Sequence, residues 1–320
     1  MFYSLIAAFL VSLLIALACG PLYIPLLRRL KAGQAIREEG PQSHYKKAGT
    51  PTMGGVIFLT GILATTILFA YDSAEAWLAL AVTFGHAGLG FADDFIKVVL
   101  KRNLGLRARE KFIGQIVMTI IIAVVSQVVF HRGTDLWIPV VDAVINIGWL
   151  YYVLIFFVLV GTTNAVNLTD GLDGLAAGAT VVSAAAMAII AVLFNHQALG
   201  IFAATVSGGC LGFLKYNKHK AQVFMGDTGS LALGAALAMV ALLTKTELLF
   251  LIIGGVYVAE ALSVMIQVAY FKHTGGKRIF RMSPLHHHFE LGGWNETKVT
   301  FVFWSCGVLC AAIALMLVLI

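Results

Sequence analysis

The sequence predicts an all-α integral membrane protein of about ten transmembrane helices with both termini extracytoplasmic. Its 320 residues are 60% hydrophobic and only 12% charged, with a mean hydropathy of +0.91. These values lie outside the range of soluble globular domains. Apolar runs of about 20 residues, enough to cross a ~30 Å hydrocarbon layer as helices, recur along the chain.

The expected spans are apolar runs separated by short polar connections, which predicts one polytopic domain over residues 1–320. They cover residues 2–27, 52–71, 75–96, 112–131, 143–161, 172–194, 198–215, 229–244, 247–271 and 298–320. The first run has no basic residues before it and continues to Arg28 and Arg29, so it is typical of a retained span, not a signal peptide.

The basic residues determine the predicted orientation, because their excess marks cytoplasmic loops. With the N-terminus outside, 20 of the 22 Lys and Arg residues fall on the inside, and only Arg132 and Lys245 fall outside. This topology accounts for the net charge of +6, so no nucleic-acid partner is expected. Such basic inner loops attract phosphorylated substrates and anionic headgroups.

Five of the eight aspartates lie at the inner ends of spans or in the short inner loops between them: Asp93, Asp94, Asp170, Asp173 and Asp227. Neighbouring carboxylates repel each other unless a cation neutralises them. A few carboxylates with open coordination positions suit Mg²⁺, which takes further ligands from water and substrate phosphates. We therefore expect a shared divalent cation and phosphoryl transfer at the cytoplasmic surface, although a solvated helix end is the alternative for an isolated acidic pair.

The segment 161–178, GTTNAVNLTDGLDGLAAG, places Asn164, Asn167, Asp170 and Asp173 three residues apart. Each step of three drifts about 60° around a helix, so the four side chains cannot share one helical face. The pattern predicts a helix end, a polar turn and a new helix whose first turn holds Asp170 to Asp173. A capped turn with no ligand is the alternative.

Two further polar segments lie on the inner side. Asp227 precedes an apolar helix, where it is either a site residue or only an N-cap. His286, His287 and His288 are consecutive. Zinc binding is disfavoured for them because adjacent residues do not point to one ion, so contacts to phosphate or an orienting role are expected.

Five motifs occur in order across residues 44–290: HYKKAGTPTMGG, ADDFIK, NAVNLTDGLDGLAAG, VFMGDTGS and SPLHHHFE. They closely resemble those of the phospho-N-acetylmuramoyl-pentapeptide transferase family, one of the bacterial polyprenyl-phosphate sugar-1-phosphate transferases. Ser283, where alanine is common, is a minor departure.

The resemblance implies transfer of phospho-MurNAc-pentapeptide from UDP-MurNAc-pentapeptide to undecaprenyl phosphate, giving lipid I and UMP in the bacterial cytoplasmic membrane. It also implies Mg²⁺ as cofactor and a homodimer. The reaction is a single displacement in the family, and an aspartyl-phosphate on Asp93 or Asp94 is the alternative. A related enzyme using UDP-GlcNAc is the alternative for the substrate.

The resemblance also implies residue roles. Asp227 is the principal metal ligand, Asp93 and Asp94 deprotonate or position the lipid phosphate with Lys97 nearby, and the three histidines lie near the phosphates. Phe224 is the ring that stacks on uracil. The expected substrate-binding set is Lys46, Lys111, Asn167, Asp170, Gly171, Leu172, Asp173, Asn217, Phe224 and Gln267.

Two other classes compete with this interpretation. A transporter would place acids near the middle of the bilayer and often carries internal repeats, whereas these aspartates gather at one face and no repeat is seen. A non-catalytic membrane scaffold would have no reason to respond to Mg²⁺. Glu260 lies inside the ninth span and is interpreted equally well as a functional residue or as a structural partner of another helix.

Overall fold

The computed structural model describes residues 2–30, 49–100 and 105–319, which are mostly helical. The elements in chain order are α1 (Phe2–Arg29), α2 (Gly55–Ala70), α3 (Ala74–Val98), α4 (Ala108–Val128), β1 (Asp135–Ile138), β2 (Ala143–Asn146), α5 (Leu150–Thr169), α6 (Leu175–Leu193), α7 (Gln197–Asn217), α8 (Gly226–Thr244), α9 (Glu247–Ile253), α10 (Gly255–His273), α11 (Leu285–Glu290) and α12 (Glu296–Leu319).

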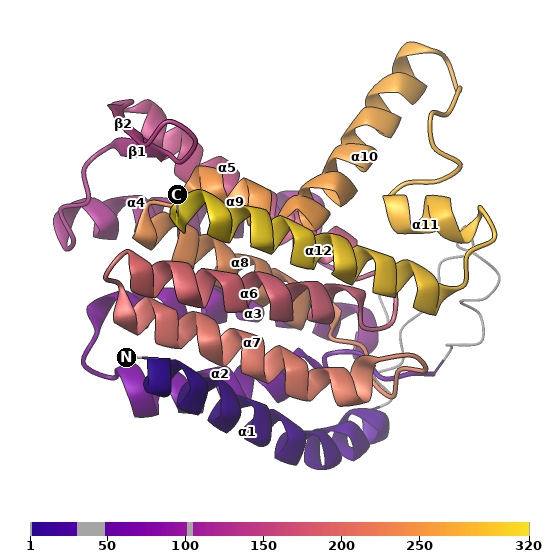
Figure 1. The fold of residues 1–320 in the computed structure, drawn as a ribbon. Helices are drawn as coiled ribbons and strands as arrows, with labels where there is room; N and C mark the ends of the chain where they lie inside the picture. The colour runs from indigo at the N-terminus through magenta and orange to yellow at the C-terminus, as the bar shows by residue number, and fades with distance from the viewer. Residues whose placement is uncertain (1, 31–48, 101–104, 320) are drawn as a thin grey trace.

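The helices form a bundle around α8, in which every residue from Thr228 to Thr244 is buried. The most extensive helix contacts join α1 to α7, α3 to α8 and α6 to α7. Both termini lie at one end of the bundle, and α11 lies at the other end (Figure 1). The C-terminal end of α3 meets the N-terminal end of α8.

Within the described residues, seven helices are long and apolar enough to cross a membrane, or eight if the bent pair α9 and α10 is one span. The protein is thus a multi-pass helical membrane protein. The expected number of ten is not confirmed on this criterion. The helix α2 has only 16 residues. The hydropathy of α3 is lowered by Glu75, Thr83, His86, Asp93, Asp94 and Lys97.

The ninth predicted span, 247–271, is wrong as a single straight helix. It breaks at Gly254, where α9 and α10 are bent by 84°. The break falls at the Gly254–Gly255 pair, where the low helix propensity of glycine makes an interruption inexpensive. Beyond the break, α10 projects away from the bundle (Figure 1).

The predicted start of the fifth span at residue 143 is also wrong. Residues 143–146 form β2, which pairs antiparallel with β1 so that Asp135 is opposite Asn146. The Nζ of Lys245 donates to the carbonyl oxygens of Gly133 at 3.3 Å and Asp135 at 2.9 Å, which holds the hairpin against the bundle. The apolar residues before α5 therefore belong to a hairpin, and the helix begins only at Leu150.

The contact between α3 and α8 depends on a small residue at Gly90. A Cβ atom at this position would overlap the carbonyl group of Asp227 and the backbone nitrogen of Thr228. Small residues allow two helix backbones to approach closely in membrane bundles. Gly90 therefore brings the acidic end of α3 against the first turn of α8.

We predict that Gly90→Ala lowers both thermal stability and activity, because the added methyl group forces α3 and α8 apart at Asp227. Gly88→Ala is the matched control, since Gly88 is exposed on the same helix and its Cβ would meet nothing within 4 Å. The control should be neutral or stabilising, by up to about 1 kcal/mol in helix propensity. Thermal unfolding in detergent measures the change in stability of both variants, and UMP release measures the change in activity. Equal behaviour of Gly90→Ala and Gly88→Ala would contradict the packing argument.

Candidate active site

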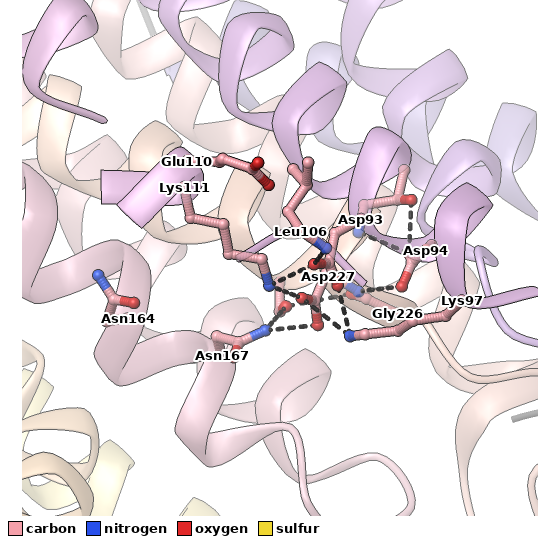
Figure 2. Close-up of polar contacts among 12 residues, drawn as sticks. Asp93, Asp94, Lys97, Leu106, Glu110, Lys111, Asn164, Asn167, Gly226 and Asp227 are labelled. Atoms are coloured by element: carbon pink, nitrogen blue, oxygen red, sulfur yellow. Dashed lines mark hydrogen bonds and ion pairs between the residues drawn. The ribbon is translucent and has the colours of Figure 1, made fainter. Parts of the chain in front are cut away.

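Three carboxylates meet where the end of α3 reaches the start of α8. Asp93, Asp94 and Asp227 each offer an oxygen within 4.8 Å of the others. The side chains of Lys97 and Lys111 extend to this group, with Asn167 on a third side (Figure 2). We call Asp93, Asp94 and Asp227 the carboxylate cluster.

Asp94 binds the N-terminus of α8. Its Oδ2 accepts hydrogen bonds from the backbone N–H of Thr228 at 2.9 Å and from the Thr228 hydroxyl at 2.7 Å, and its Oδ1 accepts from the N–H of Asp227 at 3.2 Å. The positive end of the helix dipole favours a carboxylate here. Asp94 therefore fixes the backbone that carries Asp227.

Asp93 faces the lysines. Its Oδ2 forms an ion pair with Lys97, one turn later on α3, and its Oδ1 is 3.0 Å from the Nζ of Lys111. The backbone N–H of Leu106 donates to Oδ1 at 2.8 Å. Asp93 is fully buried, and such a charge is tolerated only when it is paired and hydrogen-bonded.

Asp227 forms ion pairs with the same two lysines as Asp93. Its Oδ2 lies 2.5 Å from the Nζ of Lys111 and 3.4 Å from that of Lys97. Its side chain is 17% exposed, whereas that of Asp93 is inaccessible. Asp227 is therefore the more accessible of these two carboxylates.

The amide of Asn167 completes the arrangement. Its Nδ2 donates to Asp227 Oδ1 at 3.0 Å and to the Ser230 hydroxyl at 2.7 Å. Asn164, one turn earlier on α5, points elsewhere, because its Nδ2 donates to the carbonyl of Val160 and to Gln115. Only the second of the two asparagines reaches the carboxylate cluster (Figure 2).

The carboxylate cluster suits a hard divalent cation. Three carboxylates and two ammonium groups leave one negative charge in excess when all are ionised. Mg²⁺ prefers oxygen ligands and needs only one or two carboxylates when phosphates and water supply the rest. The residues present therefore fit a magnesium ion, with the ammonium groups left to bind phosphate oxygens.

The polar turn between α5 and α6 holds Asp170, Gly171, Leu172 and Asp173. A turn between two helices is confirmed, but its position was predicted wrongly, because α6 begins only at Leu175, after these residues. Gly174, in the left-handed region at φ 75°, ends the turn and prevents the helix from starting earlier.

Asp173 belongs to a second acidic group, with His219 and Glu296. Its Oδ2 accepts from the N–H of Ala221 at 3.0 Å, and its own N–H donates to Glu296 Oε1 at 2.7 Å. His219 Nδ1 lies 3.4 Å from carboxylate oxygens of both acids. The expectation that Asp173 and Asp227 share one cation is thus not met, since Asp173 belongs to a different group and links the turn to the start of α12.

Asn217 holds two loops together. Its Oδ1 accepts from the N–H of Gly174 at 3.1 Å, and its Nδ2 donates to the carbonyl of Val223 at 3.0 Å. Phe224 is fixed by its backbone, which donates to the Pro51 carbonyl and accepts from Gly54, both at 2.8 Å. The partly exposed ring of Phe224 therefore lies on a backbone that is anchored to the segment before α2.

The three histidines have three different partners. His286 Nδ1 is 3.1 Å from Glu260 Oε1, and His287 Nδ1 is 3.0 Å from Glu290 Oε2. His288 Nδ1 accepts from the backbone N–H of Arg281 at 3.1 Å. The three rings therefore do not share a hydrogen-bonding partner through Nδ1.

Gln267 lies beside this segment and binds a loop. Its Oε1 accepts from the N–H groups of Ile279 and Phe280, both at 3.0 Å, and its Nε2 donates to the Phe280 carbonyl at 3.0 Å. The side chain of Gln267 is therefore bound to backbone groups of this loop. Lys46, predicted to contact phosphate, lies outside the described residues.

Sequence reasoning missed several contributors to this site. Thr228 and Ser230 lie one and three residues after Asp227, in the first turn of α8, where hydroxyl residues are common without a functional role. The Leu106 N–H carries no sequence signal, because backbone groups are alike at every residue. His219 and Glu296 act through contacts between distant segments, which the order of residues does not reveal.

The comparisons with known proteins agree with the site. A family model described as glycosyl transferase family 4 matches residues 76–245, and a phospho-N-acetylmuramoyl-pentapeptide-transferase signature matches residues 47–59. The chain belongs to the phospho-N-acetylmuramoyl-pentapeptide transferase family.

Three relatives carry the name phospho-N-acetylmuramoyl-pentapeptide-transferase. The chain is 55% identical to that of Desulfitobacterium hafniense, with 94% of each chain covered. It is 56% identical to that of Desulforamulus reducens, covering 96% of this chain and 93% of the relative. Identity to the Bacillus subtilis protein is 53%, over 98% and 96% of the two chains.

We predict that Asp94→Asn destabilises the fold, because an amide has one acceptor oxygen and its NH₂ group would face the N–H of Asp227. Loss of these hydrogen bonds should cost about 1–3 kcal/mol. Asp72→Asn, at an exposed position just before α3, makes the same charge change and is the control. Thermal unfolding in detergent should separate the two variants; an unchanged midpoint for Asp94→Asn would show that this cap does not stabilise α8.

Proposed function

We propose that this chain transfers phospho-N-acetylmuramoyl-pentapeptide from UDP-MurNAc-pentapeptide to undecaprenyl phosphate, forming lipid I and UMP with the help of Mg²⁺. The observation that supports the chemistry most strongly is the carboxylate cluster with its two lysines at the junction of α3 and α8. Relatives more than 50% identical over nearly the whole chain carry the matching name.

Asp227 is the residue best suited to hold the metal ion. It lies in the first turn of α8, is the more exposed of the two lysine-bound carboxylates, and is oriented by Asn167. When bound, Mg²⁺ supplies neutralisation of the charge that develops on the diphosphate and the leaving UMP.

The two adjacent aspartates have separate tasks in this proposal. Asp94 already accepts three hydrogen bonds from the start of α8, so it positions Asp227. Asp93 orients Lys97 and Lys111 and is the base for any proton on the lipid phosphate. Both lysines bind phosphate oxygens, as ammonium groups on flexible stems do.

The transfer itself is a displacement at phosphorus. An oxygen of the lipid phosphate forms a bond to the phosphorus that carries the sugar, the bond from that phosphorus to the bridging oxygen breaks, and UMP departs. Positioning and charge stabilisation supply most of the catalysis in such reactions. A cluster of fixed carboxylates and ammonium groups provides both.

The nucleoside is proposed to bind beside the carboxylate cluster, on Asn167 and the turn from Asp170 to Asp173. Asn217 and Gln267 contribute by holding the surrounding backbone, and Phe224 offers a ring for uracil. The three histidines border the phosphates in this arrangement. Lys46 joins the phosphate contacts by sequence motif alone.

We propose that the site faces the cytoplasm of a bacterial inner membrane and that the chain forms one transferase domain that assembles as a homodimer. If α2 and α3 also cross, and α9 with α10 counts as one span, ten crossings result and both termini are outside. Both termini lie at the end of the bundle opposite α11 (Figure 1), which fits this orientation.

The main experiment measures UMP release by purified protein with undecaprenyl phosphate, UDP-MurNAc-pentapeptide and Mg²⁺. Asp227→Asn should reduce the rate at least 100-fold while leaving the unfolding midpoint near that of the parent, because the amide removes the charge but retains the shape. Chelation of the metal should abolish release, and added Mg²⁺ should restore it. Near-normal release from a folded Asp227→Asn protein would remove Asp227 from this role.

The substrate is tested in the same assay. UDP-GlcNAc should give no product above background, because the similarity is to transferases named for the muramoyl pentapeptide. Turnover of UDP-GlcNAc alone would refute the assigned substrate. A scaffold or a transporter would release no UMP from either compound.

A further inference from the structure

Glu260 is a buried acid that the proposed reaction does not use. It lies in the second turn of α10, shortly after the 84° bend, and is fully inaccessible. Its Oε1 is 3.1 Å from His286 Nδ1 and accepts from the His286 backbone N–H at 3.3 Å. Both the ring and the backbone of His286 are therefore held by one carboxylate on another helix.

The opposite side of the His286 ring lies against the turn between α5 and α6. A Cβ atom at Gly171 would overlap His286 Nε2 and Cε1. The ring, which is 1% exposed, thus sits between Glu260 and the Gly171 backbone. Among the described residues, Nε2 of His286 has no hydrogen-bond partner.

Apolar residues flank the members of this contact along the chain, because Leu285 precedes His286 and Leu172 follows Gly171, and both Glu260 and His286 are buried. A small core joins the turn, α6, α10, α11 and α12: Leu172, Leu175, Val256, Val299 and Phe303, with Leu285, Phe289 and Trp294 packed against it. A hydrogen bond to a carboxylate is stronger in such a dry environment than in water. The interaction between Glu260 and His286 is therefore well placed to fix the ring.

We propose that Glu260 is a positioning residue of the transferase, acting through His286 on the turn that receives the nucleotide. Its carboxylate accepts a hydrogen bond from the Nδ1–H of His286 and so fixes the tautomer and the plane of the imidazole. The fixed ring packs against Gly171 and holds the Asp170–Asp173 turn in the conformation that binds the nucleotide. This inference rests on the proposed function, since it concerns the nucleotide site of that reaction.

The test is a comparison of kinetic constants in the UMP-release assay. Glu260→Gln should raise KM for UDP-MurNAc-pentapeptide about tenfold, with kcat changed less than threefold and KM for undecaprenyl phosphate unaltered. Glu247→Gln is the matched control, because Glu247 is equally buried on α9 but binds the Tyr151 hydroxyl away from His286. The control should leave both KM values unchanged.

A second variant separates positioning from general support of the fold. His286→Asn retains a donor near the place of Nδ1 but removes Nε2 and the ring that meets Gly171. If Glu260 acts through His286, adding Glu260→Gln to His286→Asn should cause no further rise in KM. If the two substitutions instead act independently, so that their fold-increases in KM multiply in the double variant, the proposal is overturned.

Gly171→Ala tests the same contact if Glu260→Gln does not fold. Its methyl group would displace the ring, so KM for the nucleotide should rise while the control Gly161→Ala, at an exposed site with open space around it, does nothing. Unchanged KM in Gly171→Ala would also overturn the proposal. A parent protein that releases no UMP would instead refute the proposed function, so the two failures are distinguishable.

Discussion

The structure depends on the contact between the carboxylate of Asp94 and the free N–H groups at the start of α8. The first turn of a helix leaves donors without intrahelical partners, and in an apolar bundle they must be satisfied by another group. Asp94 meets this requirement and in doing so brings two carboxylates of α3 beside Asp227. Gly90 makes the approach possible, because any side chain there would overlap α8.

Because of this contact, the adjacent residues Asp93 and Asp94 have different partners and different roles. Asp94 is directed to a helix terminus, while Asp93 is directed to Lys97 and Lys111. A second set of contacts supports the turn between α5 and α6: Asn217 from α7, Glu296 from α12 and His286 from α11. The chemistry of the carboxylate cluster and the shape of the turn are thus fixed by separate elements.

The sequence predicted the parts of the fold that follow from apolar run length. The sixth to eighth spans were expected at 172–194, 198–215 and 229–244 and are α6, α7 and α8, with ends shifted by a few residues. The bend at Gly254 and the hairpin before α5 were missed, because a composition window averages over a glycine pair or a four-residue strand. Both are decided by tertiary contacts, such as those of Lys245 with β1.

The sequence predicted which residues belong to the candidate site better than it predicted how they are arranged. Depth in the membrane and motif resemblance singled out Asp93, Asp94 and Asp227, and the structure brings them together. The same reasoning grouped Asp173 with them, yet Asp173 pairs with the start of α12, which no spacing along the chain indicates. Glu260 was ambiguous for the same reason, since its partner His286 lies 26 residues away on another helix.

Whether the carboxylate cluster holds a divalent cation is tested most directly by binding of Mn²⁺, a spectroscopic substitute for Mg²⁺. Binding to the purified protein is measured by electron paramagnetic resonance. We expect saturable Mn²⁺ binding that is strongly weakened by Asp227→Asn and competed by Mg²⁺. Binding of equal affinity in the parent and in Asp227→Asn would contradict this expectation, because the carboxylate cluster would then not be where the cation is held.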